Sequence, residues 1–285
     1  MASWRKLGVI AGGGELPLIL AEHLAAERAP YFIARVSPYA DRALDSHPGV
    51  AHGLGLMGAR MQALRDAGCD AIVILGQVPR PEVSNLQLDE VAIAMAPAVL
   101  AAARNGDDAL LRVLVSEHER AGFRVIGVDE AMEALLAPAG AWGQVAPSER
   151  QMNDLRKGAK LAAAVGAWDV GQGVVVCDGL VLAVEAQEGT DAMLLRVGEL
   201  PAAIRGTEAA RRGVLVKRPK PIQERRIDLP TIGVRTIEGA AAVGLAGIAV
   251  EAGAALALRR AELITYADRA GLFVYGFNAA ETDAS

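Results

Sequence analysis

Residues 213–231 read GVLVKRPKPIQERRIDLPT, an apolar strand that runs directly into a stretch of charge. We call residues 217–230 the cationic loop, because its five cations face only two anions: Lys217, Arg218, Lys220, Arg225 and Arg226 against Glu224 and Asp228. Its prolines stiffen the loop and cannot donate to a central sheet ladder. A stiff cationic loop at a strand end suits phosphate binding, and Asp228 within it is placed to hold a metal ion or a water. The alternative is a solvated basic surface loop.

Three carboxylates, Glu185, Glu188 and Asp191, follow another apolar strand, with Gly189 and Thr190 between them. Such an oxygen-rich cluster suits a hard cation such as Mg²⁺. Asp191 also stands where a helix cap would stand. Taken alone, the cluster favours capping over metal binding.

A glycine turn, Gly12-Gly13-Gly14, joins the first predicted strand to a helix with Pro17 in its first turn. Consecutive glycines let the backbone approach a ligand, and the helix N-terminus offers free N–H groups and a positive dipole end. The pattern lacks the third glycine of the dinucleotide fingerprint, and Arg35 stands where an acid would follow the second strand. NAD binding is therefore disfavoured, whereas a nucleotide or sugar phosphate fits. The alternative is a tight turn without a ligand.

Two further segments in the first half carry polar side chains beside predicted strands or helices. Gln77, in the segment 76–80 after the third strand, has an amide suited to a base edge, and a glutamine satisfied within its own loop is an equal alternative. Asp107 and Asp108 follow Gly106 at the start of a helix, where an aspartate is usually a cap. We therefore expect Gln77 to contact substrate and the aspartates to cap the helix.

Together these segments supply what phosphoryl chemistry needs. Cations and a metal ion neutralise developing charge, and a carboxylate orients or deprotonates water. The four histidines lie in the first half near no nucleophile motif, so a Ser/His/Asp catalytic set is not indicated. No GxxxxGK[ST] sequence occurs, which argues against an ATPase.

Apolar periodicity places these residues on two α/β domains joined by a short linker. Residues 1–137 alternate strands and helices, the pattern of a Rossmann-like parallel sheet with right-handed crossovers. Residues 138–147 form the Gly/Pro/Ala-rich linker, and residues 148–285 form a mixed α/β domain. In the first domain we predict strands at 7–10, 31–36, 70–76 and 123–128 and helices at 18–28, 58–68, 89–104 and 109–121.

The second domain opens with a predicted helix at 148–165, for which Ser148 or Asn153 is the candidate cap. Asp178-Gly179 between two apolar runs predicts a hairpin over 173–186. A helix near 191–200, the strand 213–216, segments at 238–243, 247–250 and 256–258, a helix at 261–270 and a strand at 272–275 complete the domain.

The amino-acid composition indicates the structural class of the protein and its cellular compartment. The 285 residues are 52% hydrophobic but only 4% aromatic, and short Val/Ile runs alternate with Ala-rich stretches, which is typical of an α/β enzyme. A net charge of -5 argues against general nucleic-acid binding. Cys69 and Cys177 lack the spacing of a disulfide framework or zinc site, so we expect a reducing cytoplasm. Neither a signal peptide nor a membrane span is indicated, so we expect a soluble or at most peripheral protein.

Motifs along nearly the whole chain resemble those of one family. They are IAGGGELP (10–17), RVSPYAD (35–41), GQVPRP (76–81), NGDDALLR (105–112), PSERQMNDLRKG (147–158), DVGQGVVV (169–176), VLAVEAQEGTDAML (181–194), VLVKRPKPIQERRIDLPTIG (214–233), GLAGIAVEAG (244–253) and DRAGLFVYGF (268–277). They resemble the UDP-2,3-diacylglucosamine pyrophosphatases of Gram-negative lipid A synthesis, of the type unrelated to metallophosphoesterases. The long second-half motifs are the most specific.

The resemblance implies Mg²⁺-dependent hydrolysis of UDP-2,3-diacylglucosamine to UMP and 2,3-diacylglucosamine 1-phosphate (lipid X), with attack at the sugar-side phosphorus. The family's essential acid falls in the E-x-R-x-D-L-P motif, here at Asp228, which would hold Mg²⁺ or position the attacking water. Lys217 and Lys220 would bind the pyrophosphate, while Glu188 and Asp191 would assist at the metal. We expect the remaining substrate contacts from Gly12, Gly13, Gly14, Gln77, Thr190, Gln223 and Arg225.

Two other functions fit the same features: a nucleotide-sugar transferase, which would need an acceptor, and a non-catalytic lipid or nucleotide sensor. The membrane-borne substrate implies transient contact with the cytoplasmic face of the inner membrane. Apolar residues in 244–258 are a hypothesis for acyl-chain contacts, and the Ala-rich helices favour a homodimer.

Overall fold

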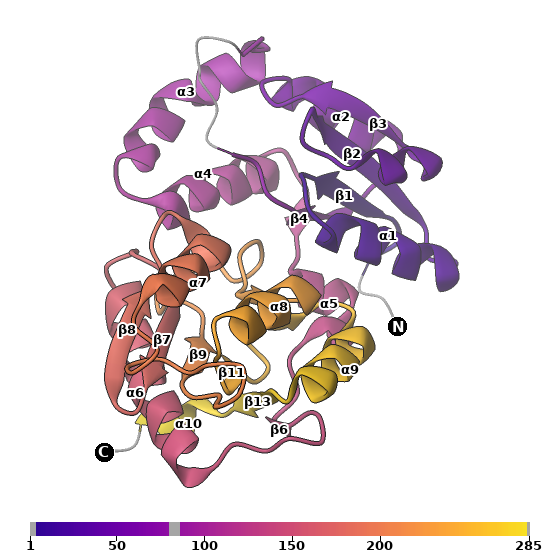
Figure 1. Cartoon of the computed structure of the whole chain (residues 1–285). Helices are drawn as coiled ribbons and strands as arrows, with labels where there is room; N and C mark the ends of the chain where they lie inside the picture. The colour runs from indigo at the N-terminus through magenta and orange to yellow at the C-terminus, as the bar shows by residue number, and fades with distance from the viewer. Residues whose placement is uncertain (1–3, 80–85, 284–285) are drawn as a thin grey trace. The chain divides into compact units, whose positions relative to one another are not determined.

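The computed structural model describes residues 4–79 and 86–283 (Figure 1). The chain forms two compact units. One comprises the residues up to Ala134 together with Glu224–Asp228, and the other comprises Leu135–Gln223 and the residues from Leu229 onward. The predicted architecture of two α/β domains is confirmed. The cationic loop is therefore divided, because its middle segment belongs to the first unit.

The first unit contains a five-stranded, wholly parallel sheet in the order β3-β2-β1-β4-β5. The predicted parallel sheet of the first domain is confirmed. The strands are β1 (Leu7–Ala11), β2 (Tyr31–Ser37), β3 (Gly49–Gly53), β4 (Ala71–Leu75) and β5 (Arg124–Val125). The periodicity analysis missed β3 because this edge strand reads GVAHG and has no buried residue, so it lacks an apolar signal.

Helices cover both faces of this sheet. They are α1 (Leu16–Ala26), α2 (Met57–Asp66), α3 (Glu90–Ala103), α4 (Asp107–Arg120) and the short α5 (Val128–Ala131), with 3-10 turns at η1 (Arg42–Ser46) and η3 (Glu133–Leu135). Met61 of α2, Met95 of α3 and Val115 of α4 pack in one apolar cluster with Ile10 and Ile72 of the sheet. The connections through α2 and through α3 and α4 run toward β5, whereas the connection through α1 runs toward β3. Because such crossovers are right-handed, α1 lies on the face opposite to α2, α3 and α4.

The second unit contains a six-stranded mixed sheet in the order β6-β13-β11-β9-β7-β8 and a two-stranded pair, β10-β12. The central strands β13, β11 and β9 are parallel, while β6 and β7 run antiparallel to their neighbours. The strands are β6 (Gly140–Ala141), β7 (Gly173–Cys177), β8 (Leu180–Val184), β9 (Val214–Lys217), β10 (Thr231–Ile232), β11 (Gly247–Glu251), β12 (Leu256–Ala257) and β13 (Phe273–Phe277). The mixed α/β class is confirmed, and β6 lies within the predicted linker.

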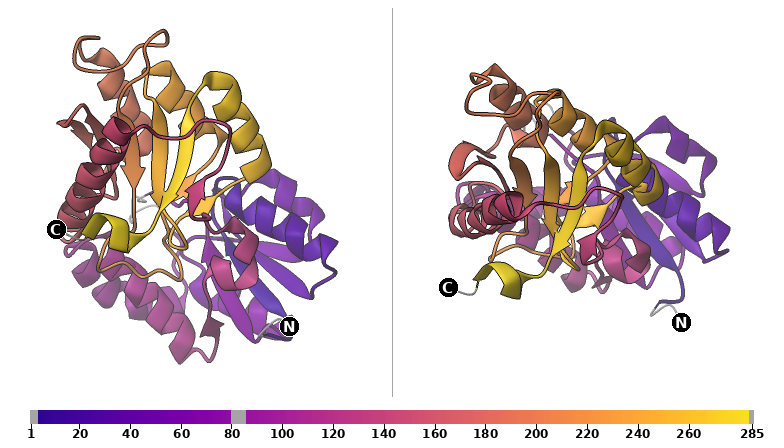
Figure 2. Two further views of the ribbon diagram at one scale, coloured as in Figure 1. Left: turned by 90° about the horizontal axis from the view of Figure 1, so that it is seen from below. Right: turned by 60° about the horizontal axis from the view of Figure 1, so that its bottom comes forward.

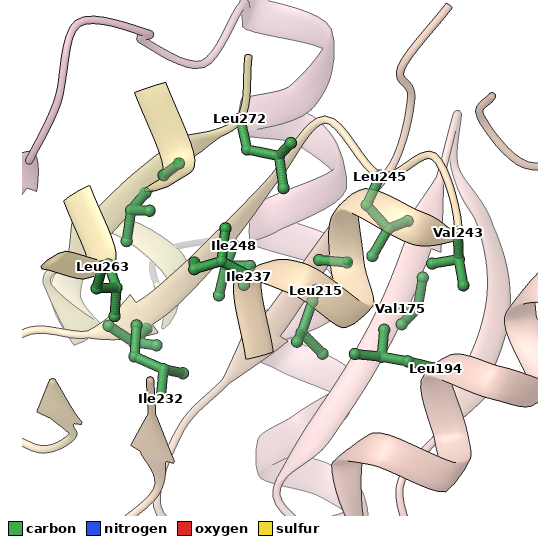
Figure 3. Close-up of a cluster of buried hydrophobic side chains, with 14 of the residues drawn as sticks. Val175, Leu194, Leu215, Ile232, Ile237, Val243, Leu245, Ile248, Leu263 and Leu272 are labelled. Carbon is green, nitrogen blue, oxygen red and sulfur yellow. The ribbon is translucent and has the colours of Figure 1, made fainter. Parts of the chain in front are cut away.

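Alternation along these strands divides the core between two faces. Val175, Leu215 and Ile248 point to the face covered by α7 (Gly189–Glu199), α8 (Val234–Ala242) and α9 (Arg260–Ala270), as Figure 3 shows. Val214 and Val216 pack on the other face with Leu155 and Ala159 of α6 (Glu149–Gly166). The ribbon of α6 lies along the sheet in Figure 2. The chain ends beyond α10 (Ala279–Asp283).

Ile248 and Leu256, which lie within the apolar segment 244–258, are almost fully buried in the unit. The hypothesis that this segment contacts acyl chains is therefore wrong for these side chains. No helix in the described residues is long and apolar enough to cross a membrane.

The helix cap and the hairpin turn that the sequence predicted in the second unit are both present. Ser148 caps α6 in a capping box with Gln151, which confirms the first of the two candidate caps. Asp178 and Gly179 both adopt positive φ, 53° and 79°, as the predicted tight hairpin between β7 and β8 requires. Their backbone N–H groups donate to the buried carboxylate of Asp154 at 2.9 and 2.7 Å, which ties the hairpin to α6.

Candidate active site

In the first unit, the loops after β1 and β4 meet at the carboxyl edge of the sheet. The Gly12 N–H donates to Leu75 O at 2.8 Å, and Gly13 and Gln77 exchange two backbone hydrogen bonds of 2.8 and 2.9 Å. A Cβ on Gly12 would lie only 2.8 Å from Gln77 O, so the two backbones touch and only glycine fits. The predicted contacts Gly12, Gly13, Gly14 and Gln77 thus lie together where the strand order reverses, the usual ligand position in such sheets. Arg80 and Pro81 of the GQVPRP motif lie outside the described residues.

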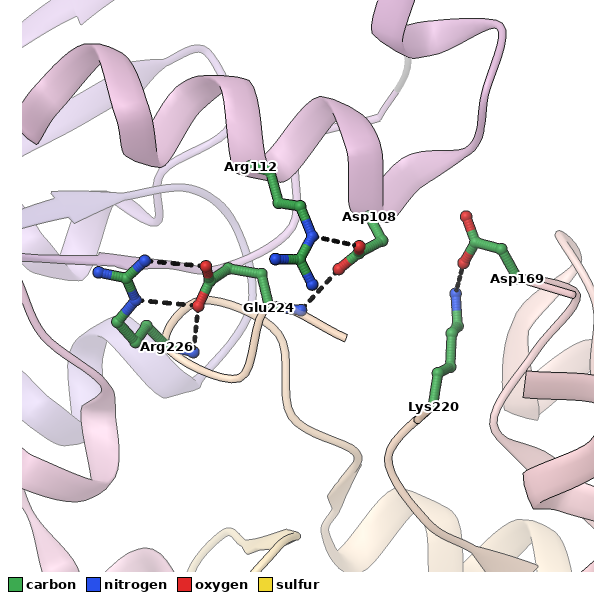
Figure 4. A network of polar contacts seen from close by, with 6 residues as sticks. All are labelled: Asp108, Arg112, Asp169, Lys220, Glu224 and Arg226. Carbon is green, nitrogen blue, oxygen red and sulfur yellow. Dashed lines mark hydrogen bonds and ion pairs between the residues drawn. The ribbon is translucent and has the colours of Figure 1, made fainter. Parts of the chain in front are cut away.

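The segment Glu224–Asp228 of the cationic loop is part of this first unit. The Glu224 N–H donates to Asp108 Oδ1 at 2.6 Å, and Arg112 Nε donates to Asp108 Oδ2 at 2.7 Å (Figure 4). Asp108 is 8% exposed. The N-terminus of α4 has Gly106 as its N-cap residue and no side-chain cap. The prediction that Asp108 caps its own helix is therefore wrong, because its carboxylate binds a chain segment distant in sequence.

Charged side chains hold the same segment further along α4. The Arg226 guanidinium donates to both carboxylate oxygens of Glu224, at 2.9 Å each (Figure 4). It also donates to Glu119 at 2.6 Å. The hydrogen bond from Arg226 holds the pKa of Glu224 below its ordinary value, and the hydrogen bond to Glu224 raises the pKa of Arg226. The paired charges thus stabilise each other's ionised form.

Asp228, the predicted catalytic acid, ends this segment. Its N–H and that of Ile227 each donate to Glu224 O at 3.2 Å, which makes one tight turn. The Ile227 side chain packs against the apolar cluster of the first unit, and the predicted substrate contact Arg225 is exposed. This turn ties the backbone of Asp228 to that of Glu224.

In the second unit, the predicted lysines lie at the carboxyl edge of the sheet. β8, β9 and β11 run in one direction, so their ends meet at this edge. Lys217 is the last residue of β9, Glu251 is the last residue of β11, and Glu185 directly follows β8. Strand ends of this kind form the ligand side of α/β domains.

Lys217 lies in a buried polar cluster with Thr190 and Glu185, which we call the Lys217 cluster. Lys217 Nζ donates to Thr190 Oγ1 at 2.7 Å, and Thr190 Oγ1 donates to Glu185 Oε1 at 2.7 Å. The ammonium lies 4.0 Å from the same carboxylate oxygen, and the two charged side chains are 5% and 8% exposed. The structure thus brings the predicted residues Lys217 and Thr190 into direct contact.

Lys220 and Gln223 form a second group at this edge. Lys220 Nζ pairs with Asp169, and the Lys220 N–H donates to Gln223 Oε1 at 2.8 Å (Figure 4). Gln223 also donates to Gln172 at 3.3 Å. A third cation, Arg218, pairs with Glu251 at 2.8 Å.

The solvated-loop alternative fails for the first part of the cationic loop. The side chains of Lys217, Arg218 and Lys220 are 5%, 10% and 11% exposed. Buried charges require partners, and each of these cations has an acid supplied by another part of the unit. Acidic side chains from outside the loop therefore compensate the charge of its first three cations.

The predicted metal ligands Asp228, Glu188 and Asp191 do not form a preformed metal site. Glu188 pairs with Arg196, and Asp191 pairs with Arg235 at 2.7 Å. Asp191 does not cap α7, which has no side-chain cap. Among residues 4–79 and 86–283, no group of three or more His, Cys, Asp or Glu side chains is placed to hold a metal ion.

Comparison with known proteins identifies the family. Residues 6–135 match the model of the LpxI N-terminal domain, and residues 138–275 match that of the LpxI C-terminal domain. The chain belongs to the LpxI family. It is 50% identical over 277 residues to the UDP-2,3-diacylglucosamine pyrophosphatase LpxI of Caulobacter vibrioides, which covers 97% of this chain and 99% of the relative. The resemblance drawn from the motifs is confirmed, and the chain is an enzyme of a hydrolase family that acts on a pyrophosphate bond.

The pairing partners of the cations in this LpxI-family site were not predicted from the sequence. Glu185 was indicated only as part of a carboxylate cluster suited to Mg²⁺, and Glu251 was not indicated. An acid at the end of a buried strand, as at β8 and β11, is a signal that could have indicated both. Asp169 pairs with Lys220 from a turn after α6 and carries no such signal. Asp108 and Glu119 also carry none, because their partners lie more than 100 positions away in sequence.

Proposed function

We propose that the protein hydrolyses the pyrophosphate bond of UDP-2,3-diacylglucosamine in lipid A biosynthesis, giving UMP and 2,3-diacylglucosamine 1-phosphate. The observation that carries the proposal is the near full-length, 50% identity to a relative with this activity in its name. The buried cations at the second-unit sheet edge support it, because a pyrophosphate needs such positive charge.

In this proposal Asp228 positions the attacking water and accepts its proton. The water oxygen bonds to the sugar-side phosphorus as the bond from that phosphorus to the bridging oxygen breaks, and the bridging oxygen leaves with UMP. Lys217 and Lys220 stabilise the negative charge that develops on the phosphoryl oxygens. Asp228 and the lysines occur in one loop, which links the base and the cations covalently.

Substrate contacts follow from the placement of the remaining predicted residues. We assign the nucleotide part to the glycine turn 12–14 and Gln77, because the turn leads into the N-terminus of α1, whose positive dipole end favours a phosphate. Thr190, Gln223 and Arg225 contact the pyrophosphate or the sugar. The hydrogen bonds that Thr190 and Gln223 make with the two lysines support this assignment.

We also propose that activity depends on Mg²⁺. The set of Asp228, Glu188 and Asp191 does not fit a preformed site, because Glu188 and Asp191 bind arginines. Mg²⁺ commonly uses one or two carboxylates and completes its shell with substrate phosphate oxygens and water. The proposal is therefore limited to Asp228 with the bound pyrophosphate, where the ion would neutralise phosphate charge.

Contact with the membrane is a further part of the proposal, since a diacylated substrate resides in a bilayer. The apolar helix α3 supports it, with Ile93 57% and Leu100 54% exposed. We place the enzyme in the cytoplasm, transiently bound at the inner membrane.

We also propose that the protein is a homodimer. Sedimentation velocity of the purified protein would measure its oligomeric state.

The test is a product assay in ¹⁸O-labelled water with the purified enzyme and UDP-2,3-diacylglucosamine. We expect UMP and a sugar 1-phosphate that carries the label, and a loss of turnover of about 10³-fold or more in Asp228→Ala. Label in UMP would move the attack to the uridine-side phosphorus, and near-normal turnover of the variant would remove Asp228 from the mechanism. If UMP is released with water as the only other reactant, the protein is not a nucleotide-sugar transferase. If the substrate binds but is not turned over, the protein is a sensor. If a chelator leaves the rate unchanged, the Mg²⁺ requirement is refuted.

A further inference from the structure

We propose that Asp108 of α4 is a positioning residue for Asp228. The inference rests on the proposed function, in which Asp228 is the catalytic acid. It assigns a role in catalysis to a side chain of the first unit that does not itself contact the reacting atoms.

The placement of one short segment motivates the proposal. Glu224–Asp228 belongs to the first compact unit, whereas the chain on both sides of it, up to Gln223 and from Leu229, belongs to the second. Five residues cannot form a core of their own, so their conformation depends on what α4 and its neighbours offer them. Contacts that the first unit supplies therefore contribute to the position of Asp228.

Asp108 makes a part-buried polar contact to the backbone of this segment. Its Oδ1 accepts the Glu224 N–H at 2.6 Å, and its Oδ2 accepts Arg112 Nε at 2.7 Å. The carboxylate is 8% exposed, so the Glu224 N–H would lose its partner in a poorly solvated place if Asp108 were removed. Arg112, one turn further along α4, fixes the direction of the carboxylate.

The contact reaches Asp228 through one turn of backbone. Glu224 O accepts the Asp228 N–H at 3.2 Å, so Asp228 moves when Glu224 moves. Arg226 adds a second attachment, since it binds both Glu224 and Glu119 of α4. A catalytic group displaced by about 1 Å commonly costs on the order of 10²-fold in rate, so this anchoring has a measurable effect.

The experiment compares steady-state kinetics of Asp108→Ala and Asp108→Asn in the full-length enzyme. We expect kcat of Asp108→Ala to fall about 10- to 100-fold, with KM within about twofold, because the base is displaced while the substrate contacts are kept. In Asp108→Asn the amide oxygen still accepts the Glu224 N–H, so most of kcat returns. The matched control is Glu117→Gln on the same helix, whose partner Arg120 lies outside the segment, and its kinetics stay unchanged.

Thermal unfolding of each variant separates misfolding from misplacement. If Asp108→Ala does not fold, Glu119→Gln carries the test, since this side chain is 45% exposed and its loss leaves the fold intact. We expect kcat of Glu119→Gln to fall severalfold with an unchanged melting temperature. A folded Asp108→Ala with the kcat of the unmodified enzyme overturns the inference, as does an Asp108→Asn variant that loses as much kcat as Asp108→Ala.

Asp228→Ala, measured in parallel, keeps this inference distinct from the proposed function. An inactive Asp228→Ala beside a fully active Asp108→Ala refutes only the positioning role. An active Asp228→Ala refutes the catalytic assignment itself, and the positioning role of Asp108 fails with it.

Discussion

At the scale of single residues, the Lys217 cluster shows how a charge is kept at a buried sheet edge. An ammonium out of water is costly unless a partner compensates it, and Glu185 is the nearest carboxylate. Thr190 bridges the two, so the cluster holds the ammonium in one place before any substrate arrives. An arriving phosphate would then meet a preorganised cation, which is how enzymes limit the cost of reorganisation.

Replacing Glu185 by Gln tests this compensation. The amide still accepts the Thr190 hydroxyl, but Lys217 loses its counter-charge, so we expect the free energy of unfolding to drop by about 2–4 kcal/mol. Urea unfolding of the purified variant gives the measurement. The control is Glu188→Gln from the same acidic cluster, whose pair with Arg196 is more exposed and should change stability by less than about 1 kcal/mol. Equal effects of the two variants would mean that Lys217 does not depend on Glu185.

At the scale of elements, a glycine of α6 packs directly against the sheet that the helix covers. A Cβ on Gly158 of this helix would lie 2.6 Å from Cγ2 of Val216 on β9 and 3.4 Å from Cγ2 of Val176 on β7. Val216 is fully buried and β-branched, so it has little freedom to give way. Gly158 therefore sets the spacing between α6 and the strand that ends in Lys217.

Gly158→Ala is the corresponding prediction. Alanine gains about 1 kcal/mol in helix propensity, but overpacking against Val216 costs about 1–3 kcal/mol, so we expect a net loss of stability. The matched control is Ala164→Gly at an exposed position of the same helix, which reports the propensity difference alone. Thermal unfolding of both variants is the measurement, and a more stable Gly158→Ala would show that the helix can move away.

At the scale of the whole molecule, the proposed contact with a bilayer is assigned to a helix with exposed apolar side chains. α3 reads EVAIAMAPAVLAAA, and of these side chains only Met95 and Ala102 are buried. An apolar helix exposed in this way is a feature of interaction surfaces.

The double variant Ile93→Ser/Leu100→Ser tests this surface. We expect it to sediment with anionic phospholipid vesicles at least about threefold less than the unmodified protein, since two exposed side chains lose about 1.5–3 kcal/mol each of apolar transfer when fully inserted. Its kcat on substrate dispersed in detergent should stay unchanged. The control is Leu195→Ser on α7, which is 70% exposed. Vesicle binding that is insensitive to the α3 changes but lost in the control would exclude α3 as the surface.

The sequence by itself determined the parts of this protein whose causes are local. Asp178-Gly179 can form the tight hairpin turn without help from the rest of the chain, and Ser148 and Gln151 cap their helix within one turn. Hydrophobic periodicity likewise indicated both α/β domains, because burial of an apolar face follows from spacing. Strand ends followed from the same pattern, which put Lys217 at the edge of a sheet.

Only the tertiary structure decided which charges meet. Lys217 and Thr190 are 27 positions apart, and Glu224 and Asp108 are 116 positions apart, so no spacing rule relates them. The carboxylates of Glu188 and Asp191 looked like metal ligands in one dimension, yet arginines bind both in the fold. Pairing between charges depends on burial and distance in space, and these quantities exist only once the chain has folded.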